Sequence, residues 1–225
     1  MIRGVIFDLD GVVVDSHPLH EEAWRSLLSE AGLDHSFDPG FIYSGLSRRE
    51  ILERYLGPLS EPEIHGFGQR KDEIFSGLVH QVEVQPGLLR VLHQLRAAGL
   101  ACAVATSAGA GRTHELLGKL GIAQHFQAVV TSCDVRKAKP APDVFLEAAA
   151  RLEINPQEAV VIEDSVAGVQ AARAADMLCL GYDRGEQAQA LRNAGASDVI
   201  ADFPGDIVSY LQQVADSISI SQRRD

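Results

Sequence analysis

Two aspartates separated by one residue, Asp8 and Asp10, follow the apolar run Val5-Ile6-Phe7 near the start of the chain. The apolar run predicts a buried strand, so both carboxylates are expected at its carboxyl end, where α/β folds carry out their chemistry. Carboxylates at such a place can bind a metal ion, attack a substrate or donate a proton, and two of them can divide these roles. The alternative is an ordinary turn, because Asp and the following Gly11 are both frequent turn residues.

Three further groups of polar residues stand at the carboxyl ends of predicted strands. Thr106 and Ser107 end one strand with hydroxyl groups, and the small residues after them leave backbone amides able to reach an anion. Lys139 is followed by Pro140, which stiffens the approach to the next helix, and Glu163-Asp164 ends another apolar run. Taken singly, these groups have ordinary explanations: a helix cap, a surface lysine and negative charge at a helix start.

Together these groups meet one chemical requirement. The two N-terminal aspartates and the Glu163-Asp164 pair would repel one another at one sheet edge unless a divalent cation lay among them. Mg²⁺ suits such a set because it prefers oxygen ligands and retains several waters. Lys139 adds a positive charge and Thr106 a hydroxyl donor. The combination is suited to stabilising a phosphoryl group during transfer.

Six short apolar runs predict the strands that position these groups. They are residues 2–7, 100–105, 127–131, 159–162, 177–180 and 198–201. From residue 100 onward the runs alternate with segments of helical periodicity, which is typical of repeated βα units with a parallel sheet. Because the runs are continuously apolar, we expect helices on both faces of the sheet. The predicted fold is α/β, with one doubly wound, Rossmann-like parallel sheet.

The stretch from residue 16 to residue 81 interrupts this alternation, because it contains no strand-like run. Its apolar spacing predicts successive helices at 18–31, 48–56 and 63–79. We therefore expect a small all-helical cap domain at 16–81, inserted into an α/β catalytic core made of 1–15 and 82–225. The segments near Asp15 and Gln85 would be the hinges of a lid.

Composition limits the compartment and the partners. The net charge is −11, which disfavours nucleic acid and anionic membranes as partners. No apolar stretch approaches the roughly 18 residues of a membrane span, and the N-terminal segment does not read as a signal peptide. The three cysteines lack the spacing of a zinc site or a disulfide framework. We expect a cytoplasmic, monomeric protein whose partner is a small-molecule phosphate ester.

The ordered motifs resemble those of the haloacid dehalogenase-like hydrolases, within them the phosphatases and phosphomutases with a helical cap. In chain order the motifs are Phe7-Asp8-Leu9-Asp10-Gly11-Val12, Thr106, Lys139-Pro140-Ala141-Pro142-Asp143 and Glu163-Asp164-Ser165-Val166-Ala167-Gly168. The resemblance implies that Asp8 is the nucleophile that forms an aspartyl-phosphate, and that Asp10 is the general acid and later the base. It also implies Mg²⁺ held by Asp8, Asp164 and the backbone carbonyl of Asp10, with Glu163 in the outer shell. A haloalkanoate dehalogenase is disfavoured, because its relatives lack an acid at the position of Asp10.

The resemblance extends in part to the cap. Gly45, Ser47 and Arg48 resemble a loop with which sugar-phosphate relatives bind the distal phosphate, and His20 resembles a hinge histidine linked to closure. The alternative for Arg48 is a solvent-exposed residue in a first helical turn. The alternative for His20 is a surface position on a helix.

Two departures concern the choice between hydrolase and mutase. Relatives that act as β-phosphoglucomutases carry a lysine where this chain has Ser44, and polar and basic residues where it has Ala108-Gly109-Ala110. A mutase must hold a bisphosphate by both ends, so the missing donors favour hydrolysis. The sequence leaves open whether Arg112 or Lys71 contributes to the phosphate site.

The sequence therefore predicts a Mg²⁺-dependent phosphatase that acts on a small phosphorylated metabolite, a sugar or polyol phosphate, through an aspartyl-phosphate. One alternative is a β-phosphoglucomutase-like phosphotransferase. Another is a phospho-accepting receiver module, which shares the sheet, the acceptor aspartate and the lysine. A receiver has no use for an acid at Asp10 or for a lid. The residues of the predicted cap do not identify the substrate.

Overall fold

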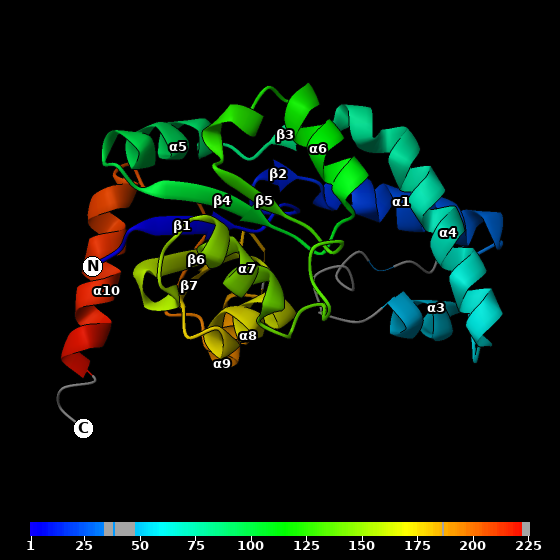
Figure 1. Ribbon diagram of the computed structural model, residues 1–225. Coiled ribbons are helices and arrows are strands. Elements are labelled where there is room, and N and C mark those ends of the chain that lie inside the picture. Colours follow the sequence, from blue (N-terminus) through cyan, green and yellow to red (C-terminus); the bar gives the residue numbers. More distant parts are fainter. Residues whose placement is uncertain (34–37, 39–47, 186, 222–225) are drawn as a thin grey trace. The chain divides into compact units, whose positions relative to one another are not determined.

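The structure is a computed structural model that describes residues 1–33, 38, 48–185 and 187–221. The chain divides into two compact units, residues 1–14 with 84–225, and residues 15–83. The first unit is built around a sheet, and the second is built from helices (Figure 1). No helix in these described ranges is both long enough and apolar enough to cross a membrane.

Six parallel strands form the sheet of the first unit, in the order β5-β4-β1-β6-β7-β8. They are β1 (Gly4–Phe7), β4 (Ala101–Ala105), β5 (Ala128–Val130), β6 (Ala159–Glu163), β7 (Leu178–Tyr182) and β8 (Asp198–Ile200). Each strand falls on one of the six predicted apolar runs. The order of the strands reverses at β1, so the prediction of a doubly wound parallel sheet is confirmed, and ligands of such sheets bind at this reversal.

Helices cover both faces of the sheet, as continuously apolar strands require. On one face α5 (Leu88–Ala97) and α10 (Ile207–Ser221) pack together, and the other face carries α7 (Asp143–Arg151), α8 (Val166–Ala174) and α9 (Ala188–Ala194) (Figure 1). The helix α6 (Ala110–Lys119) follows β4. Val5, Ile6 and Phe7 of the central strand are completely buried between these layers.

The register of the central strands brings the chemical groups to one edge of the sheet. Phe7 lies opposite Ile162 of β6, and the backbone N–H of Asp8 donates to the carbonyl oxygen of Ile162 at 3.0 Å. Asp8 therefore leaves the sheet beside Glu163, the last residue of β6. On its other side, Phe7 lies opposite Val104, so β4 ends close to the same place.

A tight loop follows Asp8. Gly11 adopts a φ of 82°, in the left-handed region that favours glycine, and its N–H donates to the carbonyl of Val14 at 2.8 Å. The side chain of Gln85 donates to the carbonyl of Gly11 at 2.8 Å and anchors the loop. Two short strands, β2 (Val14–Asp15) and β3 (Glu83–Val84), form a second sheet, and at two residues each they are too short to be predicted from a pattern.

The second unit contains α1 (His17–Glu30), α3 (Arg48–Leu56) and α4 (Glu61–Leu78), followed by the 3₁₀ turn η2 (Val79–Gln81). The three helices agree with the predicted ranges to within two residues at each end. Their buried residues form a separate apolar core of Trp24, Leu27, Leu28, Ile51 and Leu52. The predicted helical insertion after the first strand is therefore present.

Candidate active site

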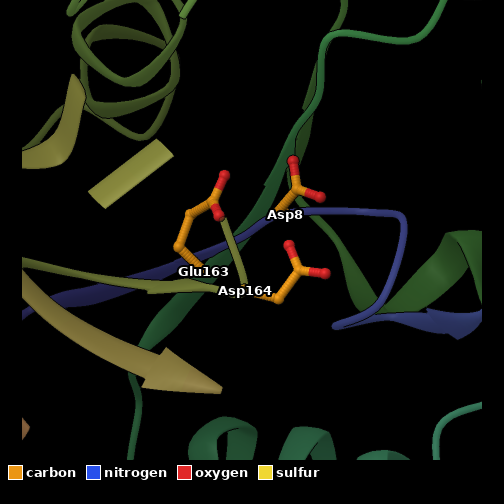
Figure 2. A group of neighbouring side chains, drawn as sticks. All are labelled: Asp8, Glu163 and Asp164. Carbon is orange, nitrogen blue, oxygen red and sulfur yellow. The ribbon is translucent and has the colours of Figure 1, made fainter. Parts of the chain in front are cut away.

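Three carboxylates gather at the ends of β1 and β6 (Figure 2). One oxygen from each of Asp8, Glu163 and Asp164 lies within 4.8 Å of the other two. Asp8 and Glu163 are buried, and Asp164 is half-buried. The structure thus brings together three of the four predicted carboxylates. The fourth, Asp10, is bound to an arginine as described below.

Lys139 is a buried cation in contact with this group. Its Nζ lies 2.5 Å from Asp8 Oδ1, 2.8 Å from Glu163 Oε1 and 3.3 Å from the carbonyl of Ala105. The same nitrogen lies 4.7 Å from the centre of the Phe145 ring in α7. Burial alone would lower the pKa of Lys139, but the carboxylates of Asp8 and Glu163 raise it above its ordinary value. Lys139 is therefore charged at neutral pH.

The carboxylate cluster carries more negative charge than this lysine offsets. Burial raises the pKa of Asp8 well above its ordinary value, the charge of Lys139 opposes this rise, and the charges of Glu163 and Asp164 add to it. A divalent cation would remove the excess negative charge, and hard cations prefer oxygen ligands of this kind. In donor type and in charge, these residues fit Mg²⁺.

Both oxygens of Glu163 already have partners. Oε1 accepts from Lys139, and Oε2 accepts from the backbone N–H and the hydroxyl of Ser165, at 2.6 and 2.9 Å. Ser165 in turn caps α8, because its Oγ accepts from the N–H of Gly168 at 3.0 Å. This arrangement favours a supporting role for Glu163 in the carboxylate group.

Gly168 makes room for Glu163, and we predict that Gly168→Ala destabilises the protein by about 2 kcal/mol and disrupts the site. A Cβ at Gly168 would lie 1.7 Å from Glu163 Oε1, and Glu163 has an exposed fraction of only 1%. Glu163 must then release Lys139 or Ser165. Thermal melts and activity assays of the variant test this.

Gly118→Ala is the matched control, because a Cβ at Gly118 in α6 meets nothing within 4 Å. The control is expected to be neutral or to stabilise the protein by up to about 1 kcal/mol. Equal melting temperatures for both variants would contradict the packing argument.

Asp10 forms a bidentate ion pair with Arg112 of α6. Arg112 Nη2 lies 2.6 Å from Asp10 Oδ1, and Nη1 lies 3.0 Å from Oδ2. The side chains of Arg112 and Asp10 are 27% and 24% exposed. The sequence spacing did not predict this pair, because the two residues are 102 positions apart. The structure therefore places Arg112 at the candidate acid.

Thr106 and Ser107 follow the end of β4, as predicted. Thr106 is buried, and its Oγ1 accepts from the N–H of Ala108 at 3.0 Å. This bond uses the hydroxyl oxygen, so the hydroxyl hydrogen stays available to donate to an anion. Ser107 is exposed in the loop that leads to α6.

Arg48 lies at the start of α3 in the helical unit. Its Nη2 lies 2.8 Å from Oδ1 of Asp72, and both side chains are about half exposed. This geometry matches the alternative of a solvent-exposed residue in the first helical turn, and a role in substrate binding stays a prediction. Gly45 and Ser47, the other predicted members of this loop, lie outside the described residues.

His20 is joined to a buried lysine within the same unit. Its Nδ1 lies 2.7 Å from Nζ of Lys71, and its ring stacks on Phe75 with the ring centres 4.1 Å apart. Lys71 has an exposed fraction of only 6%. The histidine is therefore a packed part of α1, and its predicted link to closure stays a prediction. The partnership of His20 and Lys71 was not predicted, because the two lie 51 positions apart.

Comparison with known proteins shows which family the chain belongs to. A sequence model of the haloacid dehalogenase-like hydrolases matches residues 5–182. The chain belongs to this family. A β-phosphoglucomutase of Bacillus subtilis is 31% identical over 194 residues, which cover 82% of this chain and 85% of that protein. A fructose-1-phosphate phosphatase of Escherichia coli is 35% identical over 179 residues, which cover 77% and 93%.

Solved structures of the haloacid dehalogenase-like hydrolases show the same fold. A β-phosphoglucomutase from Clostridium difficile aligns with a TM-score of 0.77 and 28% identity, covering 98% of this chain and 100% of that chain. The predictions of the family and of a hydrolase of this family are confirmed. The roles of the individual site residues stay predictions.

Proposed function

We propose that this protein is a Mg²⁺-dependent phosphatase that hydrolyses a small phosphorylated metabolite, a sugar or polyol phosphate. The observation that carries the proposal is the contact of Asp8 with Lys139 inside a cluster of three carboxylates, of which Asp8 and Glu163 are buried. The names of two relatives, a fructose-1-phosphate phosphatase and a β-phosphoglucomutase, support a phosphorylated sugar as the substrate class.

Asp8 is the proposed nucleophile. It attacks the phosphorus atom, and an aspartyl-phosphate forms as the leaving oxygen departs. Asp10 protonates that oxygen and then activates the water that hydrolyses the intermediate. Lys139 fixes the orientation of Asp8 through its 2.5 Å contact, and it offsets negative charge as the phosphoryl group arrives.

Asp8, Asp164 and the backbone carbonyl of Asp10 are the proposed ligands of Mg²⁺. When bound, the ion would supply positive charge that offsets the negative charge of the phosphate ester. Glu163 supports this site indirectly, by holding Lys139 at 2.8 Å. Thr106 donates its hydroxyl hydrogen to a phosphoryl oxygen.

The helical segment, residues 16–81, is proposed as a lid over a core of 1–15 and 82–225, with hinges near Asp15 and Gln85. A lid excludes water and completes the site when the substrate is bound. We infer that Arg48 binds an anionic group of the substrate, together with Gly45 and Ser47, and that His20 takes part in closure. Ser107, in the loop between β4 and α6, is proposed to bind the transferring phosphate.

Phosphate release tests the proposal. In a panel of sugar and polyol phosphates with Mg²⁺, we expect at least one substrate to release phosphate. Chelation is expected to lower the rate by more than about 100-fold, because the cluster then keeps its excess negative charge, and Mg²⁺ is expected to restore the rate. Ca²⁺ should support little activity, since it prefers more ligands and looser geometry. Full activity after exhaustive metal removal would contradict the metal site.

A mutase is the second candidate, because β-phosphoglucomutases are among the similar proteins. Incubation with β-glucose 1-phosphate, Mg²⁺ and catalytic β-glucose 1,6-bisphosphate separates the two functions. Formation of glucose 6-phosphate more than about tenfold faster than free phosphate would favour the mutase, a difference of ~1.4 kcal/mol between the two barriers.

A further inference from the structure

The ion pair between Asp10 and Arg112 occupies both oxygens of the candidate acid. Nη2 of Arg112 lies 2.6 Å from Oδ1, and Nη1 lies 3.0 Å from Oδ2. A guanidinium group has only donors, so it cannot accept a hydrogen bond from a protonated carboxyl group. The two-bond arrangement therefore exists only while Asp10 is a carboxylate acceptor.

The paired arrangement is incompatible with proton donation to a leaving oxygen. To donate, Asp10 must carry a proton on one of the two oxygens that now face Arg112, and it must turn that oxygen toward the substrate. The pair must therefore open before or during the first step. Its side chains are about one quarter exposed, so an anion from solution can compete for the guanidinium group.

Arg112 stands in the first turn of α6, next to small residues. Arg112 is the third residue of α6, which begins at Ala110. Among the residues that the structure describes, nothing lies within 4 Å of a Cβ built at either Gly109 or Gly111. Both glycines are exposed at the start of the helix. A guanidinium group binds carboxylate or phosphate with the same two-bond geometry.

We propose that Arg112 is a gate that a second anionic group of the substrate opens. The carboxylate or second phosphate of the substrate binds Arg112 and displaces Asp10, which then turns to the leaving oxygen. The inference rests on the proposed phosphatase function and narrows its substrate class to phosphate esters that carry a second anionic group. A substrate without that group must break the ion pair of Asp10 and Arg112 without supplying another anion to Arg112.

Two matched pairs of substrates test the gate. Glycerol 3-phosphate and 3-phosphoglycerate differ in a carboxylate, and fructose 1-phosphate and fructose 1,6-bisphosphate differ in a second phosphate. The wild-type enzyme is expected to prefer the second-anion member of at least one pair in kcat/KM, by tenfold or more. The pair that shows the preference identifies the second anion as carboxylate or phosphate.

Arg112→Ala is expected to move the two members of that pair in opposite directions. The kcat/KM of the second-anion substrate should fall by roughly ten- to hundredfold, the effect of a lost charge-assisted hydrogen bond. The kcat of the single-anion substrate should rise, by up to about fivefold, the effect of a removed, partly exposed ion pair. Arg112→Lys should restore part of the lost kcat/KM, because lysine keeps the positive charge but lacks the two-bond geometry of the guanidinium group.

Lys119→Ala is the control, since Lys119 pairs with Glu115 at 2.7 Å on the same helix, and it should leave both substrates unchanged. Equal losses for both substrates in Arg112→Ala, or no preference in the wild type, would overturn the gate.

Phenyl phosphate has a leaving group that needs little protonation, so it distinguishes failure of the gate from failure of the proposed phosphatase function. Hydrolysis of phenyl phosphate with no turnover of either second-anion substrate rejects the gate alone, and no phosphate release from any ester rejects both.

Discussion

Asp8→Asn is expected to lower kcat by at least about 10⁴-fold, a barrier increase of ~5.5 kcal/mol, while the protein stays folded. An amide oxygen is a poor nucleophile, and the water that would have to replace it has no positioned base in the first step. Measurement of phosphate release at saturating substrate and Mg²⁺ tests the expectation. Residual activity above about 1% of the wild-type rate would contradict the assignment of Asp8.

The stability of the same variant is a control for folding. Burial and the neighbouring carboxylates raise the pKa of Asp8 in the folded, metal-free protein. The folded state favours protonated Asp8. This contribution to the free energy of unfolding is present below the ordinary pKa of about 3.8, and it is lost as the pH rises through the raised pKa of the folded protein. Ionised Asp8 therefore opposes folding at neutral pH. The metal-free Asn variant should melt at a temperature at least as high as the wild type.

Lys139→Met is expected to destabilise the metal-free protein by about 3 to 5 kcal/mol near neutral pH, because it leaves the buried carboxylates of Asp8 and Glu163 without their cation. The loss should shrink as the pH falls, since protonation removes the uncompensated charges. Denaturant unfolding at several pH values, with chelator present, measures this dependence. Catalysis should also fall sharply, because Asp8 loses its 2.5 Å contact.

The matched control is Lys119→Met, which removes an ion pair whose two side chains are more than half exposed. Such pairs contribute about 0 to 1 kcal/mol to stability. The control should therefore have a small effect at every pH. A Lys139→Met variant as stable as this control, or one whose loss does not depend on pH, would contradict the electrostatic account of the cluster.

The sequence was sufficient for the features that depend on local pattern. Continuous apolar runs such as Val5-Ile6-Phe7 predicted the strands, and parallel strands place their carboxyl ends at one edge, so Asp8 was expected beside Glu163-Asp164. The helices of the insertion followed from their apolar spacing. The helix ends shifted by up to two residues, because the terminal turns are set by capping rather than by periodicity.

The features that the sequence could not provide depend on side chains distant in the chain. The pairs of Asp10 with Arg112 and of Lys71 with His20 need the packed structure, because no local pattern connects their members. The need for glycine at position 168 is another example, since it depends on where the carboxylate of Glu163 lies. Such contacts are set by packing between elements rather than by propensity.

The most direct test of the central claim, a covalent intermediate on Asp8, is a rapid-mixing experiment on Asp10→Asn with an activated aryl phosphate and Mg²⁺. The good leaving group needs little protonation, so Asp8 should still be phosphorylated, but the water that removes the phosphoryl group has lost its base. We predict a burst of aryl alcohol equal to the enzyme concentration, followed by slow turnover, with the phosphoryl group found by mass spectrometry on the peptide that contains Asp8. Turnover without a burst, or a phosphoryl group on another residue, would contradict the account.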